Sequence, residues 1–429
     1  MFYDNEVYIG TRSAWGEDVP CALHQKDRRQ HLYTIGQTGT GKSSLLRNLI
    51  TQDIALGHGI GLIDPHGDLA EAVLANIPSH RVNDVVYFNP ADTEYPIGLN
   101  LLENVPEEQR NLVASGIVAT LKGIWPEFFG PRMEYILLSS ILALLDCENT
   151  SILGIQRMLV DEKYRRWVLR QVTNPSVRGF WLGEFAQYDK RFLAEAIAPI
   201  QNKIGALTLA PVTRNILGQI KSGFDTRFIM DNKRIFIASL SKGRLGDDKA
   251  NLLGAILLTL FQLSAMRRTD NPEDERNDFY LYIDEFQSFS TTSFVSILSE
   301  ARKYRLCLTL SHQYIKQLPE SLRDGIFGNV GTLISLRVGQ SDATVLSEQF
   351  GGTLVPRHFT DLGNHRACVK QLSGGEYGEP FFSDMYPPVD MECGKRDQII
   401  KTSRERYGTK RDVVEERIER WMNQRISGF

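Results

Sequence analysis

Residues 31–56 read HLYTIGQTGTGKSSLLRNLITQDIAL, and this stretch decides the fold of the chain. The run His31–Gly36 is largely apolar, as in a buried strand, and Ser44–Leu56 has the apolar spacing of a helix. Between them, Gly36–Ser43 (GQTGTGKS) matches the phosphate-loop pattern G-x-x-x-x-G-K-[ST]. A strand before the loop and a helix after it are the context that this motif requires. The stretch therefore predicts an α/β fold with a phosphate site at a strand-to-helix turn.

Each residue type in this loop has a physical task. Glycines take backbone angles that other residues avoid, so consecutive N–H groups can surround an anion at the positive end of the helix dipole. Lys42 brings a positive charge to the outer phosphates, and the Ser43 hydroxyl suits a Mg²⁺ ion. We expect a nucleoside triphosphate with Mg²⁺ as ligands, and the expected nucleotide-binding residues are Gly36, Thr38, Gly39, Thr40, Gly41, Lys42, Ser43 and Ser44.

A second chemical signal is the run Phe279–Glu285, in which FYLYI precedes two acids. We expect Asp284 to hold the Mg²⁺ ion through water and Glu285 to polarise the water that attacks the phosphate. A later strand ends in SHQ, and its Gln313 amide is expected to sense the γ-phosphate or to orient the water. His312 is a weaker candidate for the base, because Glu285 already fills that role.

The composition excludes several classes of protein. With 429 residues, 42% hydrophobic and 24% charged, the chain is an ordinary folded protein of about three domain equivalents at roughly 150 residues each. Its 49 basic and 52 acidic residues give a net charge of −3, which argues against a uniformly basic nucleic-acid binder. Any contact with DNA must therefore come from a local patch. The five cysteines are widely spaced without a C-x-x-C pair, which indicates free thiols.

The sequence contains no clear targeting or membrane segment. The N-terminal MFYDNEVYIG differs from a signal peptide, and the most apolar run, Ala250–Ala265, falls short of the ~20 residues that a membrane span needs. We expect a buried helix there and no intrinsic membrane span. The expected location is cytoplasmic, or peripheral at the inner membrane through a partner.

Short β-type runs alternate with helical segments along most of the chain, which predicts a mostly parallel sheet with helices on both faces. The expected strands are 31–36, 59–64, 84–88, 234–240, 279–283, 306–310, 332–338 and 366–372. The expected parts are an N-terminal β or irregular segment at 1–30, a first core part at 31–105, an all-helical insertion at 106–218, a second core part at 219–394 and a charged helical tail at 395–429.

Several segments together resemble the TraG/TraD-like coupling proteins of conjugation, a branch of the HerA–FtsK superfamily of P-loop motor ATPases. Besides GQTGTGKS, the matching stretches include GLIDPHGDL at 61–69, LSKGRLG at 240–246, YIDEFQ at 282–287, EARKYRLCLTLSHQ at 300–313 and SRERY at 403–407. The resemblance implies a RecA-like core that assembles into a ring, usually a hexamer. It further implies ATP hydrolysis at subunit interfaces that moves DNA through a central channel in type IV secretion.

The resemblance also suggests roles for three further residues. Arg302 falls where similar motors carry an arginine that acts on the nucleotide of a neighbouring subunit, although by position alone a solvated helix face is the default. Asp64, in IDPHGD, would either line the site or form a structural turn. Arg337, in SLRVG, is another candidate site arginine.

Candidate DNA contacts are Lys242 and Arg244 in LSKGRLG, and Lys316 after the SHQ strand end. They belong to expected loops that would face a channel. An equally good interpretation is that they are solvated loop cations. Neither single- nor double-stranded DNA is favoured by the sequence.

Membrane-bound coupling proteins carry transmembrane helices ahead of the motor, and HerA-type repair motors carry a β-barrel there. Only 35 residues precede Gly36, so we expect a motor core without either. Three functions remain open: a DNA motor of conjugation with a secretion or relaxosome partner, a soluble motor that works with a nuclease in defence or DNA processing, and a secretion ATPase that moves proteins.

Overall fold

The computed structural model describes residues 6–14, 16–289, 294–391 and 393–423. The ends of the expected N-terminal segment (1–5) and of the expected tail (424–429) lie outside the described residues. The chain divides into two compact units. Unit 1 consists of Met1–Phe88 and Thr226–Thr402, and unit 2 of Asn89–Asp225 and Ser403–Phe429.

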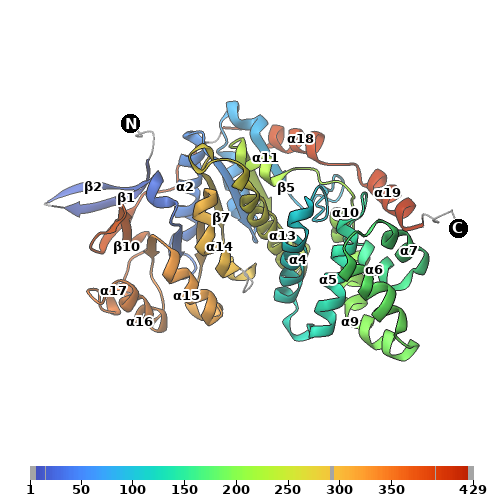
Figure 1. Ribbon diagram of the computed structural model, residues 1–429. Coiled ribbons are helices and arrows are strands. Elements are labelled where there is room, and N and C mark those ends of the chain that lie inside the picture. The colour runs from blue at the N-terminus through green and yellow to red at the C-terminus, as the bar shows by residue number, and fades with distance from the viewer. Residues whose placement is uncertain (1–5, 15, 290–293, 392, 424–429) are drawn as a thin grey trace. The chain divides into compact units, whose positions relative to one another are not determined.

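The described part of unit 1 is built on a 12-stranded sheet (Figure 1). Its strands are β1 (Glu6–Ala14), β2 (Glu17–His24), β3 (Leu32–Ile35), β4 (Gly59–Asp64), β5 (Val85–Phe88), β6 (Ile235–Ser239), β7 (Phe279–Ile283), β8 (Leu306–His312), β9 (Thr332–Ser335), β10 (Arg366–Ser373), β11 (Glu376–Tyr377) and β12 (Phe381–Met385). Their order is β2-β1-β12-β10-β9-β3-β8-β7-β4-β6-β5, and β11 pairs with β10.

The strands from β9 to β5 are all parallel, with the phosphate-loop strand β3 between β9 and β8. This confirms the expected mostly parallel α/β fold, and all eight expected strands are present. Strands β10, β12, β1 and β2 extend the sheet in antiparallel pairs. The sequence did not predict β11 and β12, because such short strands are defined by their pairing partners rather than by a pattern of their own.

Both faces of the parallel part are covered by helices. On β6, Ile235 and Ile237 join a buried cluster that includes residues of α2 (Lys42–Ala55) and α3 (Asp68–Ala75). Phe236 points to the opposite face, where its ring contacts Phe261 of α13 (Asp247–Met266). Successive residues on a strand alternate between faces, so a strand covered on both faces needs a continuous apolar run, such as IFIA at 235–238.

Helix α13 is the segment that the sequence singled out as most apolar. Together with the turn to Asp270 it is long and apolar enough to cross a membrane, judged by length and composition alone. In the structure, however, 67% of the most apolar 18-residue stretch of this segment is buried. Phe261 also stacks on Phe279 of β7. The segment therefore serves as a core helix of unit 1.

Unit 2 is helical: apart from an isolated bridge between Ile97 and Gly408, its described residues contain no strand. Its longer helices, visible in Figure 1, are α4 (Arg110–Ile124), α5 (Pro131–Leu145), α6 (Gly154–Val160), α7 (Glu162–Gln171), α9 (Lys190–Leu209), α10 (Pro211–Leu217) and α19 (Arg411–Asn423). The unit extends on both sides beyond the expected insertion of 106–218. The expected tail is divided, because α18 (Arg396–Tyr407) crosses the boundary between the two units.

Candidate nucleotide site

The phosphate loop joins β3 to α2, and its shape requires glycine at two positions. Gly39 and Gly41 have positive φ angles of 79° and 115°, which side chains disfavour. A Cβ atom on Gly41 would also lie only 2.8 Å from the Nδ1 atom of His365. Thr40 fixes the turn from within, since its hydroxyl donates a hydrogen bond to the Gln37 carbonyl at 2.7 Å.

Lys42 is buried at the start of α2, and its ammonium group lies across the loop. It donates hydrogen bonds to the carbonyls of Gly36 at 2.5 Å and Gln37 at 3.2 Å. Burial lowers the pKa of Lys42, while the charges of Glu285 and Asp284 act in the opposite direction. The loop lysine and the two acids therefore share one electrostatic environment.

Asp284 follows β7 directly and is buried. Burial, together with the neighbouring carboxylates of Asp64 and Glu285, raises its pKa to about 6. A divalent cation would relieve this crowding of negative charge. Within the described residues, no group of three or more His, Cys, Asp or Glu is placed to hold a metal ion. Asp284 and Ser43 nevertheless line the same pocket, and one acid with one hydroxyl fits Mg²⁺, which keeps several waters and binds phosphate oxygens.

Glu285 adopts a left-handed backbone conformation, with φ 46° and ψ 49°. Strain of this kind in a residue other than glycine is typical of functional sites. Both of its carboxylate oxygens accept hydrogen bonds from amides, Oε1 from Gln313 at 2.9 Å and Oε2 from Gln287 at 2.6 Å. The structure thus brings Glu285 and Gln313, which are 28 residues apart, into direct contact.

These residues surround a pocket of about 290 Å³ in unit 1. It is lined by Thr38, Gly39, Gly41, Lys42, Ser43, Ser44, His66, Asp284, Glu285, Gln313 and His365. Of the other expected loop residues, Gly36 and Thr40 are buried behind the lining. Phosphate-loop N–H groups, a lysine, a hydroxyl and two acids in one small polar pocket can hold a phosphate chain with a divalent cation and activate water beside it.

Asp64 and Arg337 belong to the support of the site rather than to its lining. The carboxylate of Asp64 accepts hydrogen bonds from the backbone N–H groups of His66 at 2.8 Å and Ala70 at 2.9 Å. It therefore fixes the turn after β4, which was one of its two expected roles. Arg337 donates a hydrogen bond to the Asn364 side chain at 3.0 Å.

The remaining candidate cations lie outside the pocket. Arg302 is exposed on the short helix Ala301–Tyr304, and Arg244 and Lys316 are exposed as well. Lys242 is different, because its ammonium group donates a hydrogen bond to the Ser288 hydroxyl at 2.8 Å. It is thereby tied to the turn that follows the acidic pair.

Two histidines of the pocket were not among the expected site residues. His66 lies in the GLIDPHGDL stretch, so its position next to Asp64 was a usable signal. His365 has no motif around it. It is placed by two backbone hydrogen bonds, from its N–H to the Thr40 carbonyl at 3.0 Å and from the Met385 N–H to its carbonyl at 2.8 Å, and it has a positive φ of 61°.

Comparison with known proteins places the chain in a family. Residues 18–358 match the family described as the type IV secretion-system coupling protein DNA-binding domain. No protein of curated function matches the chain by sequence.

Solved structures of similar fold include the plasmid coupling protein TrwB in complex with the non-hydrolysable ATP analogue ADPNP. It has 15% sequence identity and a TM-score of 0.63, over 89% of this chain and 91% of that one. TrwB in complex with ADP and Mg²⁺ has 17% identity and a TM-score of 0.59, over 90% and 97% of the two chains. VirB4 of Thermoanaerobacter pseudethanolicus has 13% identity and a TM-score of 0.59, over 91% and 99%.

The structural similarities confirm the RecA-like P-loop fold expected from the sequence. The family match covers more than half of the chain, and it agrees with the resemblance to coupling proteins that the separate motifs indicated. The chain therefore belongs to the family of the type IV secretion-system coupling protein DNA-binding domain.

Proposed function

We propose that this protein is a Mg²⁺-dependent ATPase that acts as a DNA-translocating motor of conjugation or type IV secretion. The observation that carries the proposal is the pocket that unites Lys42, Asp284, Glu285 and Gln313 in a chain of the coupling-protein family. The solved complexes of TrwB with an ATP analogue and with ADP and Mg²⁺ support the choice of ligand.

The residues of the pocket divide the proposed chemistry among them. The loop N–H groups and Lys42 hold the phosphates, and Ser43 with Asp284 holds the Mg²⁺ ion. When bound, the ion neutralises charge on the phosphate oxygens. Glu285 accepts the proton of the attacking water, with its carboxylate oriented by Gln313. Gln313 also lines the pocket and directly follows β8, which supports the proposal that it senses the outer phosphate.

We further propose that the active form is a ring, with six subunits as the expected number, in which Arg302 acts on the nucleotide of the neighbouring subunit. This agrees with the exposure of Arg302 and with its absence from the described lining of its own pocket. An interface that repeats head to tail and closes would bring this arginine to the next site.

For DNA contact we propose Arg244, Lys242 and Lys316. The structure places them on short helices rather than on the expected loops: Lys242 and Arg244 lie on Lys242–Leu245, and Lys316 lies on Ile315–Gln317. Their neutralisation is expected to reduce stimulation by DNA while basal hydrolysis by the Arg244 and Lys316 variants stays intact. Lys242 is bonded to Ser288 beside the acidic pair, so its replacement should also affect hydrolysis. Unchanged DNA stimulation in all three variants would contradict the assignment.

The decisive experiment is an ATPase titration with single-stranded, double-stranded and no DNA, run beside a measurement of particle size. Hydrolysis should rise with DNA at low salt, and Glu285→Gln should abolish it while nucleotide binding is retained. Hydrolysis that is indifferent to DNA and stimulated by a protein substrate would select the protein-moving alternative. Co-purification with a nuclease-like subunit would favour defence or DNA processing over conjugation.

A further inference from the structure

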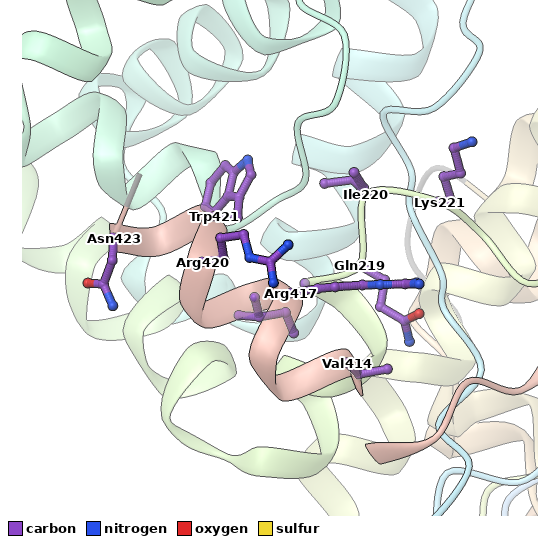
Figure 2. Close-up of a pocket in the computed structure, with 10 residues that line it drawn as sticks. Gln219, Ile220, Lys221, Val414, Arg417, Arg420, Trp421 and Asn423 are labelled. Atoms are coloured by element: carbon purple, nitrogen blue, oxygen red, sulfur yellow. The ribbon is translucent and has the colours of Figure 1, made fainter. Parts of the chain in front are cut away.

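Helix α19 forms one wall of a second pocket, which lies within unit 2 and has a volume of about 830 Å³. The opposite wall is the segment Gly218–Lys221, which follows α10. Figure 2 shows Arg417 and Arg420 extending from α19 toward this segment, and Ile220 projecting from it toward the helix. The proposed motor chemistry makes no use of this pocket.

Apolar packing and a side-chain hydrogen bond hold the two walls of the pocket together. Val414 and Ile418 of α19 are buried, and a Cβ atom on Gly218 would lie 3.0 Å from the Cδ1 atom of Ile418. The Glu415 carboxylate accepts a hydrogen bond from the Asn215 amide of α10 at 3.0 Å. The pocket is therefore a preformed feature of unit 2.

The lining is apolar at its floor and basic at its rim. Its apolar lining residues include Val414, Ile418, Trp421 and Ile220. The cations at the rim are Lys221, Arg417 and Arg420, and the described lining residues include no aspartate or glutamate.

The three cations differ in their partners. Arg420 is exposed and pairs with Glu416 on the same helix at 2.6 Å. Arg417 is exposed and has no ion pair among the described residues. An apolar pocket whose charged lining residues are all cations is complementary to a ligand that is both apolar and acidic.

We propose that this pocket is a docking site for an acidic amphipathic segment of a partner protein. Apolar side chains of the segment enter the pocket against Trp421 and Ile220, and its carboxylates pair with Arg417 and Arg420. Nucleic acid fits less well, because phosphates would meet the cations but leave the apolar floor uncovered. The inference goes beyond the proposed motor function and does not depend on the nucleotide site.

The test uses the full chain and a fluorescein-labelled 12-residue peptide of glutamate, leucine and phenylalanine, with binding followed by fluorescence anisotropy. Two control peptides replace either all glutamates by lysine or all apolar residues by serine. We expect binding of the first peptide and at least about fivefold weaker binding of both controls. Equal binding of the lysine peptide would overturn the proposal.

Protein variants locate the binding. The double variant Arg417→Glu/Arg420→Glu should weaken binding at least about fivefold, whereas Lys410→Glu, an exposed charge reversal outside the pocket, should leave it unchanged. Both arginines are exposed, so the fold and the ATPase rate are expected to persist. Unchanged binding by the double variant would contradict the assignment.

Two further measurements test whether the pocket binds nucleic acid, or the C-terminal end of this chain, instead of a partner protein. Displacement of the peptide by an oligonucleotide at equal charge concentration would assign the pocket to nucleic acid and overturn the proposal. Binding that appears only after residues 424–429 are deleted would assign it to the chain itself, with the same consequence. Binding by the full chain that survives oligonucleotide competition supports the proposal, whatever the ATPase assay shows.

Discussion

At the scale of single residues, the site combines groups that are far apart in the chain. Asp284 and Glu285 follow β7, Gln313 follows β8, and His365 precedes β10. Parallel strands bring their carboxyl ends to one edge of a sheet, so the first three meet there by topology alone. His365 reaches the pocket by a different route, through its backbone hydrogen bond to Thr40.

Replacing His365 tests whether it contributes to nucleotide binding. Its ring lies beside Gly41, at the first turn of α2, where phosphate-loop N–H groups cradle the inner phosphates. His365→Ala should therefore weaken the binding of ADP and ATP by a similar factor, about fivefold to tenfold, with little change in kcat. The measurement is a titration with a fluorescent nucleotide beside steady-state kinetics. His80→Ala, an exposed histidine outside the pocket, is the matched control.

At the scale of elements, a buried ion pair fastens α1 (Gln25–Arg28) and α2 to the sheet. The Arg28 guanidinium donates hydrogen bonds to both oxygens of Asp53 at 2.7 and 2.8 Å, and its carbon lies 3.8 Å from the ring centre of Tyr280. The Tyr282 hydroxyl also donates to Asp53. Burial alone would raise the pKa of Asp53, but Arg28 and His58 hold it at about 2.

Breaking this pair should be costly. Asp53→Asn leaves the Arg28 charge buried without its partner, so we expect a loss of about 3–5 kcal/mol in the free energy of unfolding. Denaturant titration followed by circular dichroism measures the loss. Glu162→Gln removes the exposed ion pair between Arg166 and Glu162 on α7 and should cost less than ~0.5 kcal/mol. Equal losses in the two variants would refute the structural role of Asp53.

The strands also show which parts of the fold could be predicted from the sequence and which could not. The central strands are apolar on both faces, so each could be recognised from its own residues. Strand β12 (FFSDM) has no such pattern, and it exists because β10 and β1 pair with it on either side. Likewise, Arg337 was a candidate site residue, but its bond to Asn364 turns it toward the loop before β10.

At the scale of the whole molecule, three buried groups with shifted pKa values contribute to the pH dependence of stability between about pH 6 and pH 4.5. Burial lowers the pKa of His31 to about 4 and that of His312 to about 3. The unfolded chain binds these two protons below about pH 6.5, whereas the native chain does not. Asp284 acts in the opposite direction, because its native pKa of about 6 lets the folded chain bind a proton first.

Between about pH 6 and pH 4.5 the unfolded state thus binds one proton more than the native state. The free energy of unfolding should therefore decrease by about 1.4 kcal/mol for each unit by which the pH is lowered in this window. His31→Gln removes one of the two histidines, so its stability should be nearly constant over the same window. Thermal unfolding at pH 6.0, 5.5 and 5.0 checks the slopes. An equally steep decline in the variant would show that His31 is not a source of the effect.

The proposed ring predicts complementation between two inactive variants. Arg302→Ala should bind ATP but lose most hydrolysis, because the nucleotide of the neighbouring subunit loses its arginine. Glu285→Gln should also bind ATP and lose hydrolysis, because the carboxylate that accepts the proton of the attacking water is missing. In mixtures, an interface that joins an intact Glu285 site to an intact Arg302 restores activity. ATPase assays over a range of mixing ratios measure this. No recovery at any ratio, in particles larger than a monomer, would contradict action across the interface.

The sequence by itself determined the RecA-like core, the phosphate loop, the acidic pair and the resemblance to coupling proteins, because each depends on residues close together in the chain. The tertiary structure alone decided which distant side chains share a pocket. It brought Gln313 to Glu285, gave Asp64 a structural turn, added His365 to the nucleotide pocket and joined α19 to Gly218. These contacts depend on strand order and helix packing, which involve the whole chain and leave no local pattern.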